Sequence, residues 1–395
     1  MAPTAPPPTA GPLAGVTVLD LSTVGPAARA TRLLADYGAT VVKVGAVPGR
    51  GPAPVMPPFF AYSAQRGMRR VQLDVRHPDG LEAFLALAAG ADVVVESFRP
   101  GVVDRLGIGY EDVRAVNAGI VYCSTSGYGQ EGPRATWAGH DLNYLAVAGF
   151  LATSGPRADG GPPIPGATIA DAAAGGMHAA LAITAALFSR HLTGEGTFLD
   201  VSVADGALWL MSLAVDEHLA IGTEPGPGHD VLTGRYACYD TYRAADGRWL
   251  AVAAIEAKFF ANLCRALGCE EWTDRQYDDD AQDEVRAAFT AAFARYDRDT
   301  WVAKLSADDT CVAPVQAVAE ITHDPQFASR GAVVAVSDID GRSFSQLGAL
   351  LAGMPPVSAP VIVSDPTETD TDELLESAGV DPARIATLRG AGVVA

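Results

Sequence analysis

Short apolar segments alternate with amphipathic segments in the first third of the chain, and this alternation most constrains the fold. Residues 16–21 (VTVLDL) and 40–44 (TVVKV) are β-branched runs, and residues 27–37 between them have a helical pattern. The same order recurs, with predicted helices at 79–89 and 111–116 and predicted strands at 92–96 and 119–124. The pattern predicts an α/β fold with a mostly parallel sheet covered by helices. Because no GxGxxG motif opens the first helix, a nicotinamide or flavin site is not indicated.

The rest of the chain predicts further elements and a second unit. Residues 171–191 are small and apolar on all sides, which suggests a helix packed in the interior. Glycine and proline at 221–230 indicate a linker, and after it the turn at Ala245-Asp246-Gly247 joins two predicted strands. The later predictions are helices near 256–268, 281–295, 299–305 and 370–390, with an irregular proline-rich region at 341–366.

The charge balance limits the classes of partner. The chain has 395 residues and a net charge of −19, without a basic run, so binding to nucleic acid or to an anionic membrane surface is disfavoured. An anionic ligand would need a local basic patch. Apolar stretches are interrupted by charge or glycine before the ~20 residues that a membrane span requires, and the N-terminus lacks a secretory signal pattern. We therefore expect a cytoplasmic protein that does not enter a membrane.

The segment GHDLNY at 139–144, followed by Asp171 at the start of the alanine-rich helix, carries the clearest chemical signal. A histidine and a carboxylate on opposite faces of a carbon next to a carbonyl can remove a proton from one face and return one to the other. His140 and Asp171 thus form a candidate racemase pair. Each residue also has a non-catalytic interpretation: His140 could be a polar loop residue, and Asp171 could be a helix N-cap.

Several motifs together resemble CoA-transferase family III, and within it the α-methylacyl-CoA racemase branch. They are GPLAGVTVLDLS, LLADYGATVVKV, SFRPGVVDRLGIGYEDVRAVN, GYGQEGPR, GHDLNY, the TGEG turn, YDTYRAADGRWLAVAAIE and CVAPVQAVAEITHDP. The resemblance implies an interlocked homodimer, with a Rossmann-like large domain and a small α/β domain in each protomer. The expected boundaries are a disordered extension at 1–11, the large domain at 12–222, the small domain at 223–335 and a C-terminal segment at 336–395 that returns to the large domain.

The same resemblance assigns roles to particular residues. It implies that His140 and Asp171 are the two proton carriers and that the backbone N–H of Asp141 holds the thioester oxygen. Glu256, which alone could be a first-turn helix acid, would orient His140 from the small domain. The active site would lie where one protomer's large domain meets its partner's small domain. No metal is expected, and no cofactor beyond the CoA of the substrate.

Matching motifs also nominate residues that bind CoA, although each arginine could equally be a solvated surface residue. The candidates are Arg76, Phe98, Arg99 and Arg105, with Lys43 or Arg50 as substitutes and Arg66, Arg69 and Arg70 as a cluster that could assist. Two departures from the family pattern stand out. Ala46 lies where a charged CoA contact is usual, and Ala167 lies where racemases often place an asparagine, four residues before the catalytic aspartate.

The sequence therefore predicts epimerisation of the α-carbon of a 2-methyl-branched acyl-CoA through an enolate. One rival is CoA transfer between carboxylates, with Asp171 as the nucleophile. The other is a member of the same fold that only binds an acyl-CoA, or that was recruited for another isomerisation or a cyclisation. Met177, Trp209, Leu210 and Met211 predict only that the acyl pocket is apolar.

Overall fold

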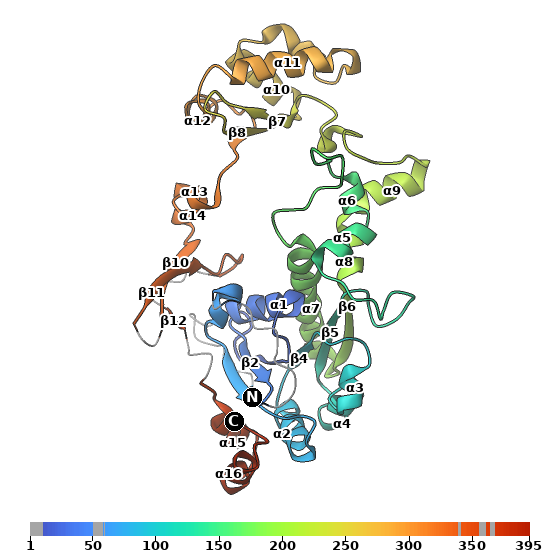
Figure 1. Cartoon of the computed structure of the whole chain (residues 1–395), viewed down its shortest axis with the longest axis vertical. Coiled ribbons are helices and arrows are strands. Elements are labelled where there is room, and N and C mark those ends of the chain that lie inside the picture. The colour runs from blue at the N-terminus through green and yellow to red at the C-terminus, as the bar shows by residue number, and fades with distance from the viewer. Residues whose placement is uncertain (1–10, 50–57, 59, 339–340, 355–360, 364–367) are drawn as a thin grey trace. The chain divides into compact units, whose positions relative to one another are not determined.

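The computed structural model describes residues 11–49, 58, 60–338, 341–354, 361–363 and 368–395 (Figure 1). The chain divides into two compact units. The large unit comprises Met1–Ala148, Pro165–Leu210 and Pro325–Ala395, and the small unit comprises Gly149–Ile164 and Met211–Asp324. The chain thus passes from the large to the small unit after residue 210 and returns after residue 324, rather than at the expected 222 and 335. Residues Gly149–Ile164, which lie within the expected large domain, also belong to the small unit. The expected extension, apart from its last residue, and Arg50 lie outside the described residues.

A six-stranded parallel sheet forms the centre of the large unit, which confirms the predicted α/β architecture. Its strand order is β3-β2-β1-β4-β5-β6. The strands are β1 (Thr17–Asp20), β2 (Thr40–Gly45), β3 (Arg69–Gln72), β4 (Val93–Glu96), β5 (Val121–Ser126) and β6 (Thr197–Ser202). The order reverses between β1 and β4, and ligands of doubly wound sheets bind at such a switch point, beyond the carboxyl ends of the strands.

Helices cover both faces of this sheet. Successive strand residues point to opposite sides, so each strand packs against both layers of helices. Val18 and Val93 pack toward α1 and α7, while Leu19 and Val94 pack with Phe84 of α2 on the other face. The helices of the large unit up to residue 210 are α1 (Gly25–Asp36), α2 (Pro78–Ala89), α3 (Val102–Leu106), α4 (Tyr110–Val116), α5 (Asp141–Val147), the π-helix η2 (Ala170–Met177), α7 (His178–Thr193) and α8 (Val203–Leu210). A short 3-10 helix, η1 (Ala61–Gln65), precedes β3.

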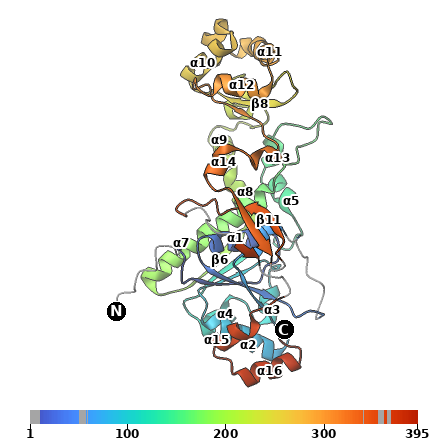
Figure 2. The same cartoon turned by 90° about the vertical axis from the view of Figure 1, so that its left-hand side faces the viewer.

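The C-terminal part of the large unit contains a second sheet, so the expectation of an irregular region at 341–366 was wrong for residues 343–347 and 361–363, while residues 355–360 and 364–366 lie outside the described residues. β10 (Val333–Asp338) pairs antiparallel with β11 (Ser343–Leu347) and parallel with β12 (Val361–Val363) (Figure 1). Figure 2 shows β11 of this sheet from a second direction. The helical tail was predicted correctly, as α15 (Thr371–Ser377) and α16 (Pro382–Gly390). The chain end then returns to the main sheet, where Val394 bridges Leu73. One further helix of this part is α14 (Pro325–Ser329).

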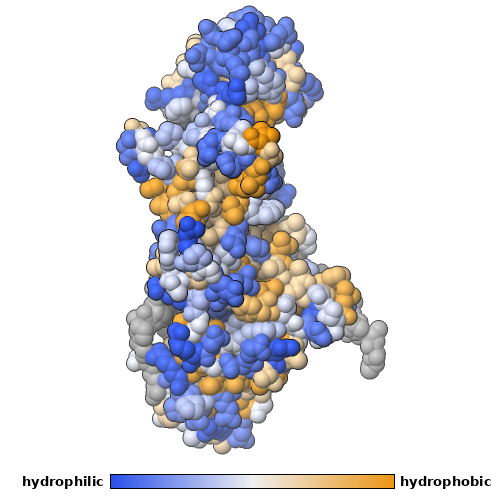
Figure 3. Space-filling view, turned by 90° about the vertical axis from the view of Figure 1, so that its right-hand side faces the viewer, coloured by the Kyte–Doolittle hydropathy of each residue, from blue (hydrophilic) through white to orange (hydrophobic). Residues whose placement is uncertain are grey.

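The predicted interior position of the helix at 171–191 holds for only one of its faces. α7 packs on α1, β5 and β6, but Leu181, Phe188 and Leu192 are 69%, 67% and 70% exposed. Their spacing places them on one side of the helix. Figure 3 shows large hydrophobic areas on the side of the molecule where α7 lies. The continuous helix Ala170–Thr193 is long and apolar enough, by length and composition, to cross a membrane, although 44% of its most apolar stretch is buried within the protein.

The small unit is built on an antiparallel sheet of β7 (Tyr239–Arg243), β8 (Trp249–Ala253) and β9 (Val312–Pro314). The hairpin between β7 and β8 lies where the sequence predicts it. Phe260, Phe289, Phe293 and Trp301 fill the core between this sheet and its helices. The helices are α6 (Phe150–Thr153), α9 (Ser212–Ile221), η3 (Val231–Thr233), α10 (Ala257–Leu267), η4 (Glu270–Arg275), η5 (Asp279–Ala281), α11 (Gln282–Phe293), α12 (Arg298–Leu305) and α13 (Val318–Ile321).

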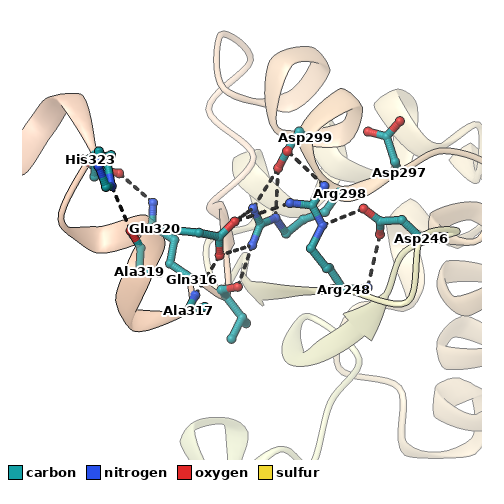
Figure 4. Close-up of polar contacts among 12 residues, drawn as sticks. Asp246, Arg248, Asp297, Arg298, Asp299, Gln316, Ala317, Ala319, Glu320 and His323 are labelled. Carbon is teal, nitrogen blue, oxygen red and sulfur yellow. Dashed lines mark hydrogen bonds and ion pairs between the residues drawn. The ribbon is translucent and has the colours of Figure 1, made fainter.

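An ion-pair network ties α12 to α13 in the small unit (Figure 4). Arg298, only 5% exposed, donates to the Val315 carbonyl at 2.9 Å and to Glu320 Oε1 at 2.5 Å. Arg248 reaches Asp299 and Glu320 from the other side. The two arginines lower the pKa of Glu320 to about 2, mainly through the hydrogen bond from Arg298. The network therefore stabilises the last segment of the small unit before the chain leaves it.

Candidate active site

Three loops of the large unit meet beyond the carboxyl ends of the central strands. α1 follows β1, the turn Ser97–Gly101 follows β4, and the loop that contains His140 follows β5. Because the strands are parallel, the chain leaves each of them at the same edge of the sheet. Five of the residues nominated from the sequence lie in these loops or directly after them: Phe98, Arg99, Arg105, His140 and Asp141.

His140 occupies the N-cap position of α5, with extended backbone angles of φ −133° and ψ 176°. Its N–H donates to Asn143 Oδ1 at 3.0 Å, and its exposed imidazole makes no capping hydrogen bond. Gly139 before it must lack a side chain, since a Cβ there would lie 2.8 Å from Tyr144 Cε1. The local packing thus fixes the backbone of His140 and leaves its ring accessible.

Asp171 lies in the first turn of the π-helix η2, a rare helix type that is frequent at functional sites. Its N–H donates to Asp141 Oδ1 at 2.9 Å. Asp141 is the first residue of α5 and directly follows His140, so this bond joins the two predicted segments. The sequence predicted that the backbone N–H of Asp141 donates to the thioester oxygen. Its side chain has a second role that the sequence did not indicate, because it accepts the Asp171 N–H.

Burial raises the pKa of Asp171, and the negative charge of Asp141 raises it further. Arg29 and, to a smaller extent, His140 lower the pKa of Asp171 and so oppose these effects. The carboxyl is half-buried, and its surroundings act on its pKa in both directions. Such a balance suits a group that must both accept and donate a proton.

Tyr144 supports the backbone of the loop before His140, and the sequence predicted no role for it. Its hydroxyl donates to the Gly139 carbonyl at 2.6 Å, and its ring packs edge-to-face on Tyr128 with centroids 5.2 Å apart. Burial, with the charges of Asp171 and Asp141, raises the pKa of Tyr144 to about 12. Tyr144 is therefore a neutral support for the loop. The only sequence signal for it was its place in GHDLNY.

The turn after β4 brings together three of the predicted CoA contacts: Phe98, Arg99 and Arg105. The buried Glu96 carboxylate accepts the Phe98 N–H at 2.7 Å, which shapes the turn. Phe98 packs against the core, and the Arg99 side chain is exposed. Arg105 folds back over the turn, with its Nη1 3.3 Å from where a Cβ on Gly101 would lie.

The other predicted CoA contacts have different surroundings. Arg76 is exposed between β3 and α2. Lys43 is buried, with its ammonium 2.7 Å from Asp20 Oδ2 and bonded to the Ser22 carbonyl. This environment favours a structural role for Lys43. The expected assisting cluster is likewise engaged within the protein, since Arg66 donates to the Leu347 carbonyl and Arg69 pairs with Asp370 and Glu373.

Glu256 belongs to the small unit, where it forms the N-cap of α10 directly after β8. The carbonyl of Ile255 before it accepts hydrogen bonds from Gln276 Nε2 at 2.6 Å and Tyr277 Oη at 2.5 Å. These bonds fix the turn, and the Glu256 side chain is exposed. Among the described residues of both units, no group of three or more His, Cys, Asp or Glu could hold a metal ion.

Comparison with known proteins gives a consistent result. The model of CoA-transferase family III matches residues 13–367. The human alpha-methylacyl-CoA racemase is 32% identical over 97% of both chains, and the mouse succinyl-CoA:glutarate CoA-transferase is 30% identical over 82% of this chain and 76% of its own. The crystal structure of a CAIB/BAIF family protein from Brucella suis superposes with a TM-score of 0.74 at 28% identity, covering 94% of this chain and all of its own. The protein therefore belongs to CoA-transferase family III and is an enzyme of this type.

Proposed function

We propose that the protein epimerises the α-carbon of a 2-methyl-branched acyl-CoA by proton transfer between two bases. The observation that carries this proposal is the hydrogen bond from the Asp171 N–H to Asp141, which joins the carboxyl segment to the residue after His140. It supports the pairing of the accessible His140 imidazole with the half-buried Asp171 carboxyl, because it links the two segments that carry them. The 32% identity to a racemase over nearly the whole chain supports the same chemistry.

In this mechanism one base removes the α-proton while the C–H electron pair forms the enolate carbon–carbon double bond. The conjugate acid of the other base then protonates the opposite face, and the thioester carbonyl forms again. A thioester α-proton is a weak acid, so the enolate oxygen needs a hydrogen-bond donor. We assign this role to the backbone N–H of Asp141, at the first position of α5.

The CoA part of the substrate would bind along the turn after β4. Arg99 and Arg105 present guanidinium groups suited to phosphate oxygens, and Phe98 offers a ring at the same turn. Arg76 would add a further cation. No metal or separate cofactor takes part in the proposed reaction.

We further propose that the active form is an interlocked homodimer, in which the partner's Glu256 orients the imidazole of His140. A carboxylate bonded to one ring nitrogen fixes the tautomer and raises the basicity of the other. The exposed apolar row on α7 supports an obligate partner, because an isolated chain would leave these side chains in water.

The test is α-proton exchange in D2O with the (2R)- and (2S)-2-methylacyl-CoA, compared among wild type, His140→Ala and Asp171→Ala. Exchange with inversion that is lost in both variants supports the two-base mechanism. Absence of exchange, with transfer of CoA to an added carboxylate such as glutarate, would instead make Asp171 a nucleophile. The identity to a succinyl-CoA:glutarate CoA-transferase is the observation that keeps this second function under test. Neither activity would point to a binding or recruited member of the fold.

A further inference from the structure

Arg29, near the start of α1, lies against the helix that carries Asp171. Two consecutive glycines of η2 permit this contact. A Cβ on Gly175 would lie 2.5 Å from Pro26 Cβ, and one on Gly176 would lie 2.8 Å from Arg29 Cβ. Any larger residue at these positions would push α1 away from η2. The packing thus brings the stem of Arg29 directly against the helix of the catalytic carboxyl.

Neutral groups hold the guanidinium of Arg29 in place. Its Nη2 donates to Thr168 Oγ1 at 2.5 Å, and its Cζ lies 5.6 Å from the centre of the Tyr62 ring. Tyr62 is itself fixed, because its hydroxyl accepts the Gly25 N–H at 2.8 Å. Within the described residues, no carboxylate forms an ion pair with Arg29, and its buried Nε has no hydrogen-bond partner. Its positive charge is therefore not neutralised by a direct contact there.

Asp171 is the carboxyl on which this charge acts. Arg29 lowers the pKa of Asp171, against burial and against Asp141. From α5 and the residue before it, Tyr144, Asp141 and His140 also face Asp171. The remaining charged residues on the packed helices act elsewhere. Arg32 pairs with Asp36 on α1, and Arg190 of α7 pairs with Asp92. The causes of the raised pKa of Asp171 do not include Asp205 of α8 or His178 and His191 of α7.

We propose that Arg29 is the positioning residue of Asp171, a cation held by Thr168 and Tyr62 that favours the carboxylate form of this proton carrier. Ala167 offers no polar side chain to the carboxyl, and in this proposal Arg29 of α1, which packs against η2 at Gly176, supplies the partner instead. This inference rests on the proposed function for its catalytic consequence. The electrostatic part concerns the protein alone and is measurable without any substrate.

The first experiment measures the protonation of Asp171 without using activity. The full-length protein is treated with a water-soluble carbodiimide and an amine between pH 4 and 8, and labelling of the Asp171 peptide is quantified by mass spectrometry. Because carbodiimides react with the protonated carboxyl, Arg29→Met is expected to raise labelling near pH 6 by roughly threefold to tenfold. Arg29→Lys should restore most of the wild-type profile. Arg114→Met, an exposed residue of α4, is the control for the same change in net charge.

The second experiment records the pH dependence of α-proton exchange for the same variants. We expect the acidic limb of the profile to move to higher pH in Arg29→Met, with little change in KM, and to return with Arg29→Lys. Thr168→Val should move the acidic limb in the same direction but by less. This variant replaces Arg29→Met in both experiments if Arg29→Met does not fold. Labelling profiles of folded Arg29→Met, or of Thr168→Val in its place, that superpose on the wild type would overturn the inference. A shifted labelling profile without exchange activity in the wild type would uphold the electrostatic role and reject the proposed reaction.

Discussion

Glu96 provides the sharpest test of the electrostatics at the carboxyl edge of the sheet. It ends β4 with 1% of its surface exposed, and its carboxyl oxygen Oε2 accepts the Phe98 N–H. Burial raises the pKa of Glu96 from 4.5 to about 7, with smaller contributions from Asp104 and Asp200, while hydrogen bonds from Ser124 and Phe98 oppose the rise. Ionisation of this side chain is therefore unfavourable in the folded protein.

The sign and the size of the effect on stability follow from linkage. Because the folded-state pKa lies above the unfolded-state value, the stabilising contribution is complete below about pH 4.5 and is lost as the pH rises through about 7. The difference between these two values corresponds to roughly 3 kcal/mol. Glu96→Gln remains neutral and still offers an oxygen to the Phe98 N–H, so it should escape this loss. The variant is expected to gain stability relative to wild type as the pH rises from 5 to 8.

The assay is urea unfolding of wild type and Glu96→Gln at pH 5, 6, 7 and 8, compared as the difference in unfolding free energy at each pH. Charge effects common to both proteins cancel in this difference. Glu111→Gln, an exposed glutamate of α4, is the matched control and should show no such trend. A difference between wild type and Glu96→Gln that stays constant from pH 5 to 8 would refute the assignment.

Three further predictions concern packing, assembly and the network of the small unit. Gly139→Ala should destabilise the large unit by roughly 1–3 kcal/mol in urea unfolding because its Cβ would meet Tyr144, whereas Gly166→Ala, with open space around it, should not. If the proposed dimer uses the exposed face of α7, Leu181→Asp should lower the mass measured by light scattering to that of a monomer. Val116→Asp changes an exposed apolar residue of α4 and serves as the control, so it should leave the wild-type mass unchanged. A dimeric wild type whose mass Leu181→Asp does not change would remove α7 from the proposed interface. The pKa of Glu320, lowered to about 2, means that its pairing with Arg298 stabilises the fold above about pH 4.5 and fails toward pH 2, so the destabilisation by Arg298→Met should shrink over that range in urea titrations.

The sequence predicted those helices and strands whose own residues show a clear hydrophobic pattern. The strands β1, β2, β4 and β5 are apolar runs because helices bury both of their faces. β3 was missed, since it is a polar edge strand (RRVQ) that is recognisable only from its pairing with β2. β11 (SFSQL) was missed for the same reason. The exposed face of α7 could not be predicted, because an apolar composition does not tell whether the same chain or a partner covers it.

Candidate site residues could be nominated from the sequence where they lie in one short motif, but not where the contact joins segments far apart in the sequence. His140 and Asp171 were nominated from their motifs, and the hydrogen bond from the Asp171 N–H to Asp141 joins the two segments. Arg29 is 139 residues from Thr168 in the sequence, and no local pattern links the two. Lys43 shows what the sequence cannot reveal, because its nomination as a phosphate ligand was made without knowledge of its buried pairing with Asp20.

The two candidate reactions make opposite demands on Asp171, and the surroundings of this residue indicate how to separate them. A nucleophile must be ionised throughout, so CoA transfer should rise to a plateau with increasing pH and should survive the loss of His140. Epimerisation needs one carrier protonated and the other not, so its rate should follow a bell-shaped profile that requires both residues. Burial and Asp141 favour the neutral carboxyl, while Arg29 and His140 favour the carboxylate. A site built only for a nucleophile would gain nothing from the first pair, and this opposition is the physical reason to expect a bell-shaped profile.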